Sequence, residues 1–122
     1  MSDGRSKTIF CDIDGVLLCH SGDITKQHLE KGSKLIISST LDKLREWDKK
    51  GYNIILVTGR RESVREHTEK QLAEVGIFYD KLVMGIGGGV RILINDKKNN
   101  SYEDTAIAIN LIRNEGIGKC TI

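Results

Sequence analysis

Short apolar, β-prone runs alternate along this chain with segments of helical periodicity, and this alternation constrains the fold more than any other feature. Strands are expected at residues 8–13, 52–57, 81–84, 91–94 and 119–122, and helices at 39–50, 62–75 and 102–114. The run 52–57 is apolar almost throughout, a pattern typical of a parallel strand that is covered on both faces. The order of elements therefore predicts a three-layer α/β fold with a mainly parallel, five-stranded sheet.

Length and charge narrow the possibilities further. The 122 residues predict one domain spanning 1–122, with an irregular flap or insert at about 16–38 and no cap domain. The 19 basic and 17 acidic residues give a net charge of +2, too near neutral to indicate a nucleic-acid or membrane partner. Neither a membrane span nor a signal segment is recognisable, so we expect a cytoplasmic protein, and the cysteines have no metal-type spacing.

Polar residues follow three of the expected strands at the point where each ends. Asp12 and Asp14 come after the first strand, Thr58-Gly59-Arg60 after the second, and Asp96 after the fourth. Because ligands of open parallel sheets bind at the carboxyl ends of the strands, we expect these side chains to converge on one edge. Asp12, Asp14 and Asp96 would bring three carboxylates there, together with a hydroxyl and several cations.

Crowded carboxylates repel one another unless a cation or a proton compensates their charge. A cluster of oxygen donors without thiols favours a hard ion such as Mg²⁺ over zinc, and that ion would also neutralise a phosphate group. With a phosphate ester present, one aspartate can attack phosphorus while a second protonates the leaving oxygen and later activates water. The pattern thus indicates phosphoryl chemistry.

Three motifs carry a resemblance to a known family. Asp12-Ile13-Asp14-Gly15-Val16, Thr58-Gly59-Arg60 and Leu93-Ile94-Asn95-Asp96, in that order, resemble the motifs of the haloacid-dehalogenase (HAD) superfamily. The resemblance implies a Rossmann-like core, and the aspartate two residues after the first resembles the phosphatase branch. Within the superfamily the chain is most similar to small capless phosphatases, including those associated with capsule and surface-polysaccharide biosynthesis.

The resemblance also implies residue roles. It makes Asp12 the nucleophile, Asp14 the general acid and base, and Thr58 the hydroxyl that binds phosphate, with Gly59 and Arg60 beside it. Mg²⁺ would be held by Asp12, by the backbone carbonyl of Asp14 and by Asp96.

The chain departs from the family pattern at one cationic position. The family carries a lysine shortly before its last acidic strand, but residues 85–90 contain none, which leaves Lys81 and Arg91 as the candidate phosphate-binding cations. Asn95 stands where many relatives have a glycine or a second acid.

The function expected from these features is Mg²⁺-dependent hydrolysis of a phosphate monoester, with a sugar phosphate or similar small metabolite as substrate. Two alternatives stay open: a phosphatase for a bulky substrate, such as a nucleic-acid end or a phosphoprotein, and a catalytically weak binding or assembly subunit. Nucleic acid is disfavoured because the chain has no basic patch rich in aromatic residues. A signalling receiver domain is disfavoured because its phosphorylated aspartate follows a middle strand. Without a cap, the site would be closed by residues 16–38 or by a second subunit, so a homo-oligomer is expected.

Overall fold

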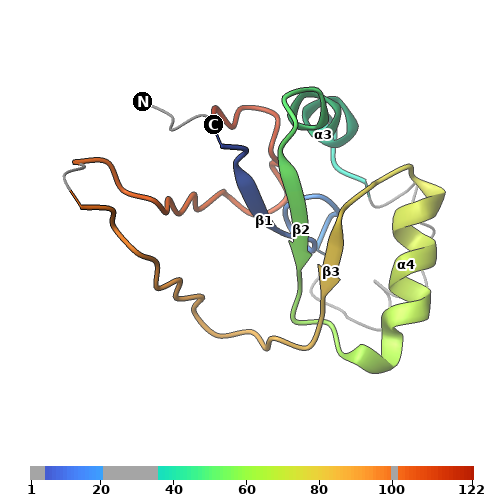
Figure 1. Ribbon diagram of the computed structural model, residues 1–122. Helices are drawn as coiled ribbons and strands as arrows, with labels where there is room; N and C mark the ends of the chain where they lie inside the picture. The colour runs from blue at the N-terminus through green and yellow to red at the C-terminus, as the bar shows by residue number, and fades with distance from the viewer. Residues whose placement is uncertain (1–4, 21–35, 100–101) are drawn as a thin grey trace.

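The computed structural model describes residues 5–20, 36–99 and 102–122 (Figure 1). Its regular elements, in chain order, are β1 (Thr8–Asp12), α3 (Thr40–Lys49), β2 (Asn53–Val57), the 3-10 turn η1 (Glu62–Val64), α4 (Arg65–Glu74) and β3 (Lys81–Val83). The elements expected at 8–13, 39–50, 52–57, 62–75 and 81–84 are thereby confirmed, to within one or two residues at each end. Most of the flap expected at 16–38 lies outside the described residues.

The three strands form one parallel sheet in the order β1-β2-β3. Asp12 is in register with Val57, and Val57 with Val83, so the three strands end beside one another. Figure 1 shows the three strands pointing the same way, with α4 alongside β3. The parallel α/β class predicted from the alternation of elements is confirmed.

The core explains why the chain forms these elements. Leu44 and Trp47 of α3 lie three residues apart and are 0% and 2% exposed, as expected for one face of an amphipathic helix. They join one apolar cluster with Ile54 and Leu56 of the central strand and Leu72 of α4. The buried face of each helix thus packs in the same apolar cluster as the sheet and stabilises it.

The sheet described by the structure has three strands, and the prediction of five is wrong for this part of the chain. Residues 91–94 and 119–122 form no strand, and the described residues of 102–114 form no helix. Residues 85–99 and 102–113, which we call the arm, lie away from the sheet after β3 and come back to it near residue 113 (Figure 1). The arm's apolar side chains stay exposed instead of packing: Ile92 is 82% exposed and Ile94 is 90% exposed. Among the described residues, no helix has the length and apolar character needed to cross a membrane.

Candidate functional site

The loops that follow the three strands meet at the carboxyl edge of the sheet. The Thr58 amide donates to the Val83 carbonyl oxygen at 3.0 Å, and the Thr58 carbonyl accepts from the Ile86 amide at 3.3 Å. The Gly85 amide donates to the Arg60 carbonyl oxygen at 2.7 Å. These bonds join the loops after β2 and β3 into one surface next to the end of β1, where the sequence predicted a site.

Asp12 ends β1 and keeps an exposed surface. One of its carboxylate oxygens, Oδ1, accepts a hydrogen bond from the Ile13 amide at 2.9 Å. Partial removal from water is the main reason that the pKa of Asp12 is raised, and the charge of Asp14 adds to this, whereas the Ile13 amide and the charges of Arg91 and His20 oppose it. The carboxylate is therefore accessible and lies within the electrostatic influence of Asp14 and Arg91.

Asp14 lies in the tight turn that follows β1, and its carboxylate is held by Arg60. The Arg60 Nε donates to Oδ2 at 2.9 Å and Nη2 donates to Oδ1 at 2.8 Å, a bidentate ion pair. The side chains of Arg60 and Asp14 are only 4% and 18% exposed. The turn itself requires a left-handed residue, which Gly15 supplies with a φ of +90°.

Thr58, Gly59 and Arg60, which follow β2, make different contacts from one another. The Thr58 side chain is buried, and its hydroxyl oxygen accepts a hydrogen bond from the Arg60 amide at 3.1 Å. Gly59 lies so close to the loop after β3 that a Cβ there would stand 2.8 Å from the Gly87 carbonyl oxygen. The phosphate contacts expected for Thr58, Gly59 and Arg60 stay predictions, and Arg60 already makes four side-chain hydrogen bonds to protein groups.

The two candidate cations occupy different positions. Lys81 begins β3, two residues before the edge, and is exposed. Arg91 lies in the arm, where its Nη1 donates to the Gly89 carbonyl at 2.6 Å, and its charge lowers the pKa of Asp12. Of the two, Arg91 is the cation whose charge acts on the Asp12 carboxylate.

Asp96 is not brought to the other two aspartates. It lies in the exposed arm, where its backbone carbonyl accepts from the Thr105 hydroxyl while the neighbouring Asn95 Nδ2 donates to the same hydroxyl at 2.9 Å. In the described ranges, no three His, Cys, Asp or Glu side chains are grouped so as to hold a metal ion. Asp12 and the Asp14 carbonyl are suitable oxygen donors for Mg²⁺, but without Asp96 these residues do not make the expected three-carboxylate site.

The sequence did not predict two sets of contacts at the site. Asn114 ties the end of the arm to the turn after β1: its amide donates to the Gly15 carbonyl at 2.8 Å, and its side chain bonds both backbone groups of His20. Thr68 and Gln71 on α4 bind Arg60 from the side opposite Asp14. Their spacing with Leu72 and Val75 would have placed both polar residues on the buried stripe of the helix.

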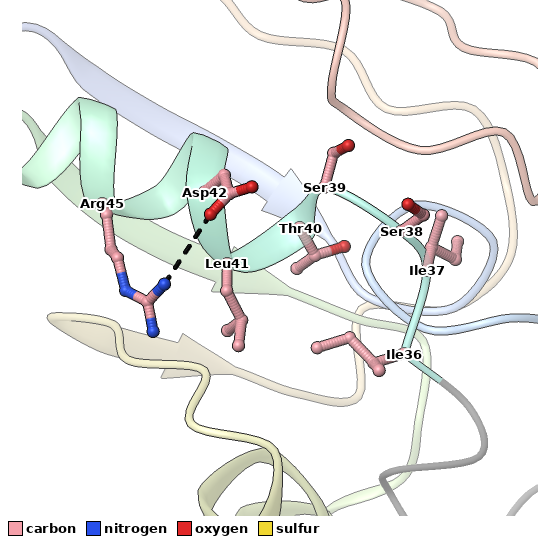
Figure 2. Close-up of a pocket in the computed structure, with 8 residues that line it drawn as sticks. All are labelled: Ile36, Ile37, Ser38, Ser39, Thr40, Leu41, Asp42 and Arg45. Carbon is pink, nitrogen blue, oxygen red and sulfur yellow. Dashed lines mark ion pairs between the residues drawn. The ribbon is translucent and has the colours of Figure 1, made fainter.

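A pocket lies at the start of α3 (Figure 2), lined by Ile36, Ile37, Ser38, Ser39, Thr40, Leu41, Asp42 and Arg45. The Asp42–Arg45 ion pair on its rim spans 3.7 Å and is exposed, and none of these eight residues belongs to the predicted site. The segment before it, 21–35, is outside the described residues, and we assign the pocket no role.

Comparisons with known proteins give structural neighbours only. No protein-family model and no curated protein matches the chain. A chain of a solved structure described as the Pnkp1/Rnl/Hen1 complex aligns over 75% of this chain at 28% identity with a TM-score of 0.57. A chain of the Pnkp1/Rnl/Hen1 RNA repair complex aligns over 84% at 25% identity with a TM-score of 0.54. This chain spans 32% and 29% of those two neighbours, so it is similar to a part of each.

Proposed function

We propose that this protein is a phosphomonoesterase of the HAD-like type, with Asp12 as the nucleophile. The observation that carries the proposal is the pair of aspartates at the carboxyl edge: Asp12 is exposed at the end of β1, and Asp14 is held in orientation by a buried arginine. The order of the three sequence motifs and the two structural neighbours are consistent with it.

The proposed reaction has two steps. A carboxylate oxygen of Asp12 attacks phosphorus, the bond from phosphorus to the ester oxygen breaks, and the acid form of Asp14 gives that oxygen its proton, which Asp14 regains in the second step. Water then attacks the phosphorus of the aspartyl-phosphate, Asp14 takes a proton from that water, and inorganic phosphate leaves Asp12. Arg91 would offset charge on the phosphoryl group, because its guanidinium already acts on Asp12.

Mg²⁺ is the cofactor that we propose on the chemistry of the oxygen donors. When bound, it would neutralise charge on the phosphate. The described residues hold only part of the expected ligand set, so we assign no step to the metal.

The test is release of inorganic phosphate from a panel of esters, with Mg²⁺ or with EDTA. Wild-type protein should hydrolyse at least one ester in Mg²⁺, and Asp12→Asn should hydrolyse none while folding normally. Asp48→Asn, an exposed aspartate on α3, is the matched control and should keep full activity. Turnover by Asp12→Asn would refute the mechanism, and a wild-type protein inactive on the whole panel would favour a binding or assembly subunit.

Sugar phosphates are the first substrate class that we propose, and nucleic-acid ends are the second. The second gains support from the neighbours, whose description names an RNA repair complex. The panel should therefore contain hexose phosphates, mononucleotides and an oligoribonucleotide with a terminal phosphate. A preference of the wild type for the oligonucleotide would replace the first substrate class with the second.

The proposal also includes a homo-oligomer that covers the Asp12 edge, because Asp12 is exposed in the single chain. Light scattering of the active protein tests this part. A fully active monomer would remove the subunit contact and leave residues 16–38 as the expected cover.

A further inference from the structure

Two polar side chains sit where α4 should present apolar ones. Thr68 is 0% exposed and Gln71 is 3% exposed, beside the apolar Leu72 on the same buried stripe. A buried hydroxyl and a buried amide destabilise a core unless they are hydrogen-bonded. Both accept from one atom: the Arg60 Nη1 donates to Thr68 Oγ1 at 3.1 Å and to Gln71 Oε1 at 2.7 Å.

The guanidinium of Arg60 connects these residues to Asp14. A guanidinium is planar and its N–H donors point in fixed directions, so contacts that orient one edge of the plane also orient the opposite edge. Thr68 and Gln71 hold the edge at Nη1, and the edge at Nε and Nη2 makes the bidentate pair with Asp14. The position of the Asp14 carboxylate therefore depends, through Arg60, on two side chains of α4.

The backbone of Arg60 is fixed as well, which leaves its side chain as the adjustable part. Its amide donates to the Thr58 hydroxyl at 3.1 Å and its carbonyl accepts from Gly85 at 2.7 Å. With the backbone anchored on both sides, the contacts at Nη1 select the side-chain conformation that points the guanidinium at Asp14. Without those contacts Arg60 and Asp14 could still form an ion pair, but the position of the pair would no longer be fixed.

We propose that Thr68 and Gln71 are positioning residues for the reaction: they orient the Arg60 guanidinium, which aims the Asp14 carboxylate at the leaving oxygen. This inference rests on the proposed function. A proton transfer requires its carboxylate within hydrogen-bond reach of the reacting oxygen, so a small displacement slows that step more than it weakens substrate binding.

Two substrates separate this role from a merely structural one. Hydrolysis of an alkyl ester, glycerol phosphate, needs a proton on its leaving oxygen, whereas nitrophenolate departs from p-nitrophenyl phosphate without one. Thr68→Val and Gln71→Met remove the acceptors at nearly constant volume. The second step is the same for both esters, so the quantity to compare is kcat/KM, which reports formation of the aspartyl-phosphate. We expect kcat/KM to fall by about 10- to 100-fold for glycerol phosphate and by less than about threefold for p-nitrophenyl phosphate.

The comparison is the ratio of the two rates on one preparation, so a partly unfolded variant does not distort it. Thr68→Ser keeps the hydroxyl and should restore the wild-type ratio, and Lys70→Met, on the exposed side of α4, should leave both rates unchanged. Equal losses on the two esters, or no loss on glycerol phosphate, would overturn the inference while leaving the proposed function standing. A wild-type protein that hydrolyses neither these two esters nor any ester of the panel above would overturn both.

Discussion

Replacement of Arg60 by methionine should be among the most destabilising changes in the described part of the chain. The methionine fills much of the same space but removes all four side-chain hydrogen bonds, leaving the Asp14 carboxylate and two buried acceptors on α4 without this partner. Breaking a buried ion pair by removing one partner costs about 3–5 kcal/mol, because the remaining charge stays away from water. The Asp14 side chain keeps 18% exposure, so water can reach it in part and the lower half of that range is expected.

A loss of about 3–4 kcal/mol is measurable, since domains of this size are stable by about 5–15 kcal/mol. Urea unfolding can be followed by the fluorescence of Trp47, the single tryptophan, which is 2% exposed in the folded protein. Arg65→Met is the matched control: Arg65 also makes a bidentate pair, with Glu62 at 2.7 and 2.8 Å, but these side chains are 35% and 61% exposed. Its loss should be far smaller than that of Arg60→Met.

A double-mutant cycle tests the attribution to the ion pair. In an Asp14→Asn background the carboxylate charge is absent, so Arg60→Met should cost less there, by about 1–3 kcal/mol. A loss below about 1 kcal/mol in the wild-type background would refute the reasoning, as would an equal loss in both backgrounds.

Three further predictions concern packing, thiol reactivity and charge. Gly59→Ala should destabilise the protein by about 1–3 kcal/mol in urea, because its Cβ would stand 2.8 Å from a backbone oxygen of the facing loop, while Gly88→Ala, with open space around it, should not; equal losses would contradict this. Burial raises the pKa of Cys11 to about 12, so a disulfide reagent at pH 8 should modify the half-buried Cys19 first and Cys11 only on unfolding, and prompt labelling of Cys11 in the native protein would contradict this. The pKa of Asp12 is raised in the folded state, so ionisation of this carboxyl destabilises the folded protein. Asp12→Asn should therefore increase the free energy of unfolding near neutral pH in EDTA, and this gain should disappear as the pH falls to the ordinary aspartate value of about 3.8. A gain that does not depend on pH would contradict this cause.

The sequence was a good guide where structure is set by local pattern. Residues 52–57 and 62–75 carry strand and helix signals that need only a neighbouring apolar surface, and both elements formed where predicted. Asp12 and Asp14 were placed at the edge because a charged pair cannot continue a buried strand. Arg60 was harder, since an arginine after a strand can face solvent, a ligand or another side chain, and only the fold shows that its partner is Asp14.

The arm shows why the third carboxylate could not be placed in the same way. The apolar pattern of 91–94 predicts that these side chains pack against a partner. A parallel pairing with β1 would join residues about 80 positions apart, and its contacts would have to offset the entropy lost in closing a long loop. Local contacts compete with that pairing: Asn95 bonds to Thr105 and Lys97 pairs with Asp104, so residues 95–97 lie beside residues 104–105. The nucleophile and its acidic neighbour are thus encoded by one strand and the turn after it, whereas the position of Asp96 depends on whether an apolar arm is buried.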